Sequence, residues 1–342
     1  MKLLFLACLT PRSGNYTTAA RLREYIEAAG HNCCLRDVAD FKTPEEVTHL
    51  ILEEEFDGCL AIHLYKGGRL LLGTSAPFGV VLGGTDINED VKHEVKREVM
   101  GKVLQKARFA VAFSSELKES AATFWPFHRN KIYVQAQGIE AKDCPSFKMS
   151  EFLQSTGLTS NHFEDLHIFL LVCGMRRVKD PLYLVKVFSE WHLEDPSVYL
   201  IIIGPEIDPA FTEEVASSVK RANGVLLASE RPQGELQAAM KTSFALVNSS
   251  ISEGMSAAVL EAMNLNVPVL ARNIPGNASI VKHEETGLLF SSPQEFIQLS
   301  KKLMQDASLR QRLVLNAKAY VTERHSTDME RLTYQQLIHL LK

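Results

Sequence analysis

The chain alternates between short apolar runs and segments with helical periodicity over almost its whole length. Continuous apolar runs are typical of strands that are buried on both faces of a sheet. We therefore expect strands at residues 2–9, 32–38, 58–64, 78–83, 109–114 and 131–135, and again at 166–173, 198–204, 224–228, 244–249 and 267–272. Because helical patterns separate these runs, the sheets are expected to be parallel, with right-handed crossover connections.

The helical patterns are amphipathic. Residues 18–29 place apolar side chains on one face, and Gly30 follows as a typical C-cap residue. Similar patterns predict helices at 45–55, 90–107, 181–192, 209–221, 234–241 and 256–264, and three helical segments close the chain. Strands that alternate with helices in this way predict an α/β protein.

A polar stretch without clear periodicity interrupts the alternation near the middle of the chain. The predicted organisation is a Rossmann-like domain at 1–145, a linker at 146–165, a second Rossmann-like domain at 166–325 and a C-terminal helix at 326–342. Ligands of open α/β sheets bind beyond the carboxyl ends of the strands. The loops at those ends are therefore expected to carry the chemistry.

Composition narrows the class of protein. Of 342 residues, 46% are hydrophobic and 23% charged, which is typical of a globular protein. The formal net charge of −4 provides no basic surface, so we expect no nucleic-acid partner. No apolar run approaches the length of a membrane span, so we expect no transmembrane segment.

The six cysteines contain no CxxC pair, so a zinc site is not expected. We interpret them as reduced thiols, which favours a cytoplasmic location. Residues 1–20 resemble a short signal peptide, and secretion is the alternative. A helix signature follows the first apolar run immediately, which favours a buried strand there.

Residues 247–263 stand apart from the rest of the chain. An apolar strand ends, a polar loop with an acid and a glycine follows, and a helix begins. The N–H groups at a helix N-terminus suit an anion such as phosphate, and Gly254 allows close approach of a ligand. Glu253 precedes the helix and Glu261 lies about two turns inside it, so both can accept hydrogen bonds from hydroxyls of one elongated ligand. Alternatively, Glu253 stabilises the helix dipole and Glu261 lies on a solvated face.

This segment resembles the E-x7-E signature of retaining GT-B glycosyltransferases of the glycosyltransferase 1/4 group. The agreement continues through further segments, which are 83–90, 113–118, 137–139, 173–181, 274–281 and 286–290. The resemblance covers most of the chain. It implies the GT-B fold, in which two Rossmann-like domains with parallel sheets face a central cleft.

The resemblance also implies an activity, the transfer of a sugar from a nucleotide diphosphate sugar, with UDP as the expected nucleotide, to an unknown acceptor. Glu253 would contact the donor sugar, and Glu261 would bind the ribose hydroxyls. Backbone N–H groups around Gly254, Met255 and Ser256 would contact sugar and phosphate.

In the same family an arginine and a lysine neutralise the diphosphate leaving group. Lys179 matches the lysine, while the arginine is Arg176, with Arg177 as the alternative. Fixed cations and helix N–H groups can stabilise that charge without a metal ion. The resemblance therefore implies metal independence, retention at the anomeric carbon and no cofactor apart from the donor.

The N-terminal half offers fewer candidates. Gly14 would border the interdomain cleft, or is a plain turn glycine. His63 and Asp86 would lie on the acceptor side, or are a structural histidine and a helix cap. Many relatives carry a histidine where this chain has Gly83.

Two competing hypotheses follow. The glycine at position 83 favours a catalytically inactive GT-B protein that acts as a nucleotide sensor or scaffold. Tandem α/β domains also permit a nicotinamide-dependent dehydrogenase, but no G-x-G-x-x-G follows the first strand, which argues against it.

Overall fold

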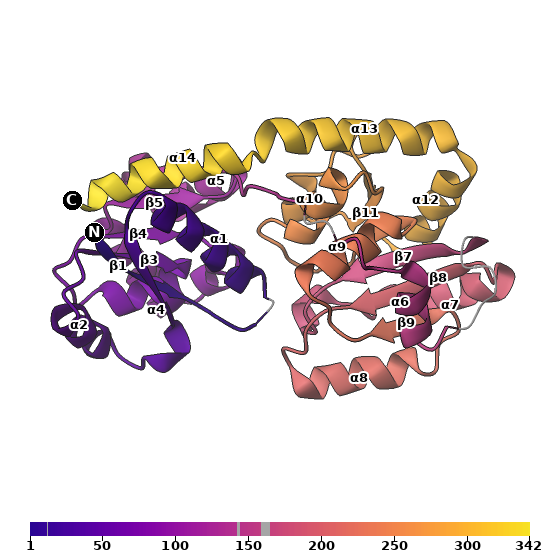
Figure 1. Cartoon of the computed structure of the whole chain (residues 1–342), viewed down its shortest axis with the longest axis horizontal. Helices are drawn as coiled ribbons and strands as arrows, with labels where there is room; N and C mark the ends of the chain where they lie inside the picture. Colours follow the sequence, from indigo (N-terminus) through magenta and orange to yellow (C-terminus); the bar gives the residue numbers. More distant parts are fainter. Residues whose placement is uncertain (12, 142–143, 159–164) are drawn as a thin grey trace. The chain divides into compact units, whose positions relative to one another are not determined.

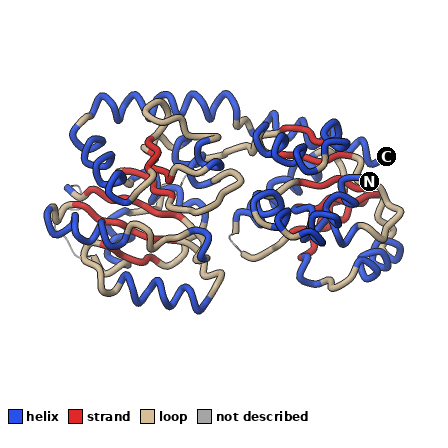
Figure 2. The backbone as a smooth tube through the Cα atoms, turned by 180° about the vertical axis from the view of Figure 1, so that it is seen from behind, coloured by secondary structure: helices blue, strands red, loops and turns tan. Residues whose placement is uncertain are grey.

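The computed structural model describes residues 1–11, 13–141, 144–158 and 165–342. They form two units, one made of Met1–Gly138 with His325–Lys342 and the other of Ile139–Arg324. Each unit contains a six-stranded sheet, in which all strand pairs are parallel, surrounded by helices (Figures 1 and 2). The predicted α/β class with parallel sheets is therefore confirmed.

The sheet of unit 1 has the order β2-β1-β3-β4-β5-β6. Its strands are β1 (Lys2–Ala7), β2 (Asn32–Asp37), β3 (Gly58–Ile62), β4 (Phe78–Val81), β5 (Phe109–Ala112) and β6 (Ile132–Val134). The chain runs from β1 outward to β2 and then returns to the other side of β1 to form β3. This reversal is a topological switch point, where the loops leaving the two strands diverge and leave room for a ligand.

The helices of unit 1 begin at residues that cap them. They are α1 (Gly14–Ala28), α2 (Pro44–Glu53), α3 (Gly84–Asn88), α4 (Glu94–Lys106), α5 (Ser115–Phe124) and α14 (Thr327–Ile338). The hydroxyls of Ser13, Thr43 and Ser114 accept N–H bonds from the first turns of α1, α2 and α5. Such bonds satisfy donors that the helix itself leaves unpaired.

The sheet of unit 2 has the order β12-β11-β10-β7-β8-β9. Its strands are β7 (His167–Val172), β8 (Val198–Ile203), β9 (Val225–Ala228), β10 (Ala245–Asn248), β11 (Val269–Arg272) and β12 (Leu288–Phe290). The chain builds outward from β7 to β9 and returns to the other side of β7 with β10. The switch point of unit 2 therefore lies between β7 and β10. The short strand β12 was not expected from the sequence.

Helices and aromatic side chains complete unit 2. The helices are α6 (Met149–Ser155), α7 (Val185–Glu194), α8 (Pro209–Val219), α9 (Gln233–Thr242), α10 (Ala257–Asn264), α11 (Pro275–Ala278), α12 (Pro293–Gln305) and α13 (Ala307–Arg324). Phe169 of β7 is fully buried, and its ring centroid lies 5.6 Å from that of Phe188 and 6.0 Å from that of Phe296. These contacts fix α7 and α12 against one face of the sheet.

The segment 146–165, which the sequence predicts to be a linker, differs from that expectation. Its described part contains α6, and Phe152 and Leu153 of this helix are buried in the core of unit 2. Unit 2 therefore begins at Ile139, whereas the second domain was expected to begin at residue 166. A helix of two turns is too short to establish a hydrophobic period. Residues 159–164 of the expected linker lie outside the described residues.

The C-terminal helix α14 belongs to unit 1, although it is far from the rest of that unit in sequence (Figure 1). Glu330 of α14 is fully buried and accepts two hydrogen bonds from the Arg21 guanidinium of α1, at 2.8 and 3.2 Å. Gly138 N–H donates to the same carboxylate at 2.9 Å. One buried carboxylate thus holds three distant segments together.

No helix among the described residues combines the length and the apolar character needed to cross a bilayer. The described cysteines are all free thiols. Burial raises the pKa of Cys33 and of Cys59 to about 12, so both remain protonated at neutral pH and act as small apolar side chains.

We expect Glu330→Ala to destabilise unit 1 by about 3–5 kcal/mol, because it leaves the Arg21 charge buried without its partner. The midpoint of urea unfolding measures this loss. Gln336→Ala, an exposed position on the same helix, is the control and should change stability by less than about 0.5 kcal/mol. Equal effects of the two variants would contradict the role assigned to the buried carboxylate.

Candidate functional site

Two loops meet at the switch point of unit 2, one after β7 and one after β10. The strands are neighbours, with Leu171 opposite Val247. Ile251 N–H donates to the Val178 carbonyl at 2.9 Å, and the Ser249 hydroxyl donates to the Lys179 carbonyl at 3.1 Å. Segments far apart in the sequence are therefore fixed against each other by one backbone–backbone and one side chain–backbone hydrogen bond.

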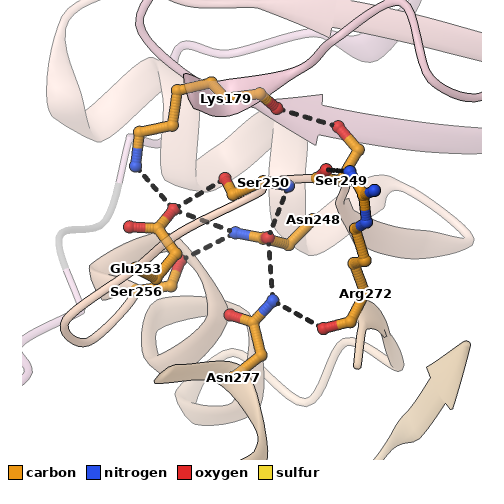
Figure 3. Close-up of polar contacts among 8 residues, drawn as sticks. All are labelled: Lys179, Asn248, Ser249, Ser250, Glu253, Ser256, Arg272 and Asn277. Atoms are coloured by element: carbon orange, nitrogen blue, oxygen red, sulfur yellow. Dashed lines mark hydrogen bonds and ion pairs between the residues drawn. The ribbon is translucent and has the colours of Figure 1, made fainter. Parts of the chain in front are cut away.

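The carboxylate of Glu253 lies at the centre of this arrangement (Figure 3). Its Oε1 atom accepts from Lys179 Nζ at 2.5 Å, from the Ser250 hydroxyl at 2.8 Å and from Asn248 Nδ2 at 3.4 Å. The side chains of Lys179 and Glu253 are 17% and 10% exposed. The ion pair is therefore largely removed from water. In such a partly buried environment the attraction between opposite charges is stronger than at the protein surface.

Arg272, at the end of β11, fixes the turn that follows Lys179. Its Nη1 donates to Asp180 Oδ2 at 2.9 Å and to the Ser249 carbonyl at 3.2 Å, and its guanidinium lies 3.9 Å from the centroid of the Tyr183 ring. Asp180 has φ 44°, in the left-handed region that non-glycine residues rarely adopt. The Arg272 contact stabilises that conformation, a role that the sequence did not reveal.

The predicted donor-binding segment begins α10 as expected. Gly254 and Met255 lie in the loop before it, and Ser256 is the N-cap residue. Gly276 of α11 approaches this loop so closely that a Cβ atom there would lie 2.1 Å from the Glu253 carbonyl oxygen. Only glycine fits at that position, so α11 can pack directly against the loop that contains Glu253.

Glu261, the second acid of the motif, lies inside α10 and is half-buried. Its Oε1 atom accepts a hydrogen bond from Gln233 Nε2 at 2.7 Å. Gln233 is the first residue of α9. Sequence reasoning missed this partner, because nothing in the chain marks a glutamine 28 residues before the acid as its neighbour.

The two candidate arginines have different surroundings. Arg177 donates to Glu214 at 2.8 Å, and its guanidinium lies 4.9 Å from the centroid of the Phe211 ring, so it is held against α8. Arg176 is exposed and makes no side-chain hydrogen bond or ion pair within the part of the chain that the structure describes. Arg176 is therefore the more available of the two for a ligand.

Cys173 lies close to Lys179 and Glu253. Burial raises the pKa of Cys173, at the end of β7, to about 12, so it is no thiolate nucleophile at neutral pH. Within the described ranges, no three or more His, Cys, Asp or Glu side chains gather as metal ligands.

Unit 1 has a polar cluster at its own switch point. His63 follows β3, and its Nε2 lies 3.0 Å from Asn15 Nδ2 in α1, while its Nδ1 lies 3.4 Å from Asp86 Oδ2. His63 has φ 69° and opens a short π-helix, His63–Gly67. Both features are uncommon and are found most often at functional sites. Gly14 is the first residue of α1 and directly precedes Asn15 of this cluster.

Asp86 is fully buried and accepts N–H bonds from Gly83 and Leu64, both at 2.9 Å. Burial raises the pKa of the Asp86 carboxyl, but His63 and these N–H donors outweigh burial and hold that pKa below its ordinary value. Asp86 therefore stays ionised at neutral pH. Its bond to Gly83 N–H also caps α3, as one of the two alternatives from the sequence expected.

Gly83 and His63 depend on each other sterically. A Cβ atom at position 83 would lie 2.0 Å from His63 Cε1 and 2.2 Å from His63 Nδ1. The imidazole of His63 therefore fills the space that a side chain at position 83 would need.

Comparisons with known proteins show which family this chain resembles. The model of the family "Glycosyl transferases group 1" matches residues 159–320. "Glycosyltransferase 1 domain-containing protein 1" from Xenopus tropicalis is 57% identical over 340 residues, which cover 99% of this chain and 97% of that protein. The Escherichia coli "UDP-Gal:alpha-D-GlcNAc-diphosphoundecaprenol alpha-1,3-galactosyltransferase" is 29% identical over 164 residues, 46% of this chain and 41% of that protein.

Among solved structures, HepE from Anabaena in complex with UDP-glucose has a TM-score of 0.78 at 16% identity, covering 99% of each chain. At such low identity the likeness concerns the fold alone. With the two parallel sheets described above, it confirms the expected GT-B fold class.

Gly83→Ala is expected to destabilise unit 1 by about 1–3 kcal/mol, because its Cβ overlaps the His63 ring. In a His63→Ala background the same change should cost much less, so a double-mutant cycle measured by urea unfolding should show strong coupling. Gly14→Ala is the control, since a Cβ there meets nothing within 4 Å. If the losses of stability caused by His63→Ala and Gly83→Ala simply add, the proposed steric overlap between the two positions is contradicted.

Proposed function

The chain belongs to the group 1 glycosyl transferases, and from that premise we propose that it transfers a sugar from a nucleotide diphosphate sugar to an acceptor. The observation that carries the proposal is the buried contact between Lys179 and Glu253 at the switch point of unit 2. A cation and an acid lie there beside the start of α10. This combination suits a ligand that carries phosphate at one end and hydroxyls at the other.

Each part of the nucleotide diphosphate sugar has a proposed partner in unit 2. Glu253 accepts hydrogen bonds from the sugar hydroxyls, and Glu261 accepts them from the ribose hydroxyls. Lys179 and Arg176 neutralise the diphosphate, and the N–H groups of the loop before α10 contact sugar and phosphate. UDP is the proposed nucleotide, supported by the UDP-glucose complex of HepE and by the donor named for the Escherichia coli relative.

The Lys179–Glu253 contact implies an exchange of partners when the donor binds. The Lys179 ammonium turns from the carboxylate to the diphosphate, and the Glu253 carboxylate then accepts sugar hydroxyls. After the exchange Lys179 is paired with the diphosphate, and the Glu253 carboxylate is hydrogen-bonded to hydroxyls, so neither charge is left buried without a polar partner.

The same residues support a reaction without a metal ion. Cleavage of the bond between sugar and diphosphate leaves negative charge on the phosphate. The cations of Lys179 and Arg176, together with the helix N–H groups, stabilise that charge as it develops. We propose retention at the anomeric carbon by analogy with the family signature that the sequence resembles.

For the acceptor, we propose His63 as the contacting group of unit 1. Asp86 is fully buried and occupied by backbone N–H donors, so it acts through His63 by holding the imidazole in place. Gly83 was the reason to consider an inactive protein. Because the His63 ring fills the side-chain space at position 83, that glycine no longer favours a nucleotide sensor or scaffold over an enzyme.

Hydrolysis of UDP-glucose, with water in place of the unknown acceptor, tests the proposed chemistry. Glu253→Ala should lower the rate at least about 100-fold, because it removes a group that orients the sugar at the reacting centre. Glu213→Ala, an exposed acid on α8, is the matched control and should leave the rate unchanged. A Glu253→Ala protein as fast as the native one would contradict the proposal.

A further inference from the structure

The side-chain amides of two buried asparagines connect Glu253 to the Arg272 carbonyl (Figure 3). Asn248 ends β10 and is 6% exposed, and Asn277 lies in α11 and is fully buried. Neither belongs to the acids and cations that define the donor site above. Buried polar side chains cost free energy unless their hydrogen bonds are made, so the direction of each bond is informative.

Asn277 determines which way the Asn248 amide points. Asn277 Nδ2 donates to the Arg272 carbonyl at 3.0 Å and to Asn248 Oδ1 at 3.0 Å. Ser250 N–H donates to the same Oδ1 atom at 3.1 Å. Since two donors meet Oδ1, the amide of Asn248 cannot be reversed without placing N–H groups against each other.

With its oxygen fixed, Asn248 directs its Nδ2 group toward the functional loop. Nδ2 lies 3.2 Å from the Ser256 hydroxyl and 3.4 Å from Glu253 Oε1. Asn248 thus connects the acid of the motif to the N-cap residue of α10. The chain of contacts runs from the Arg272 carbonyl through two amides to the carboxylate.

We propose that Asn248 is a positioning residue, oriented by Asn277, that holds the Glu253 carboxylate toward the donor sugar. The inference rests on the proposed function, in which Lys179 leaves Glu253 for the diphosphate. Ser250 and Asn248 then remain as its donors. The Ser250 hydroxyl can rotate, whereas the direction of the Asn248 N–H is fixed by three other contacts.

Asn248→Asp removes this donation. The aspartate keeps oxygen acceptors for Ser250 N–H and Asn277 Nδ2, but it cannot donate to Glu253 and adds a like charge beside it. The affinities of the full chain for UDP and for UDP-glucose are measured by calorimetry. We expect the ratio of the two dissociation constants to move about tenfold against UDP-glucose, while UDP affinity stays within about threefold.

Two further variants separate positioning from a general structural role. In a Glu253→Ala background, Asn248→Asp should change the ratio no further, because no carboxylate remains to be held. Asn277→Ala should move the ratio in the same direction as Asn248→Asp. The control is Asn316→Ala, which removes an amide that donates to the Glu285 carbonyl elsewhere in unit 2 and should not alter the ratio.

The outcomes are distinguishable. An unchanged ratio in a folded Asn248→Asp protein, or an equal loss of UDP and UDP-glucose affinity, overturns the positioning role and leaves the proposed function intact. A native protein that binds neither compound overturns the proposed use of a UDP-sugar, and with it this inference.

Discussion

The contact between Lys179 and Glu253 depends on the order of strands in unit 2. The two residues are 74 positions apart, and they meet because β10 returns to the side of β7 opposite β8. The loops that follow β7 and β10 therefore leave adjacent strands at the same edge of the sheet, where they contact each other. A parallel sheet of this order places a cation, an acid and a helix N-terminus together without any loop having to be long.

Secondary structure was largely predictable because strands buried on both faces have a distinctive pattern. All the strands expected from continuous apolar runs are present, with ends that differ by a few residues. The elements that were not predicted include α5, which has ten residues, and several shorter ones. β12 has three residues and α6 has seven, and neither length is enough to establish a period of two or of 3.6. Tertiary packing, rather than local pattern, determines such elements.

The site was predictable only where residues act through a local motif. Glu253, Glu261 and the loop between them were proposed as site residues because one strand, turn and helix contain them all and resemble the family signature. Gln233 and Arg272 were missed, since each acts through a pairwise contact that the sequence does not encode locally. Gly83 illustrates the same limit, because the need for a glycine there depends on the ring of His63, which lies 20 positions earlier in the segment after β3.

We propose that unit 2 binds a nucleotide diphosphate sugar through Lys179 and Glu261. Calorimetric titration of the chain with UDP, GDP, ADP and their sugar conjugates tests it most directly, with Lys179→Ala and Glu261→Ala as the comparison variants. The account predicts binding of the uridine compounds and a loss of about tenfold or more in each variant. Folded native protein that binds none of these nucleotides, or variants that bind UDP as well as the native chain does, would contradict it.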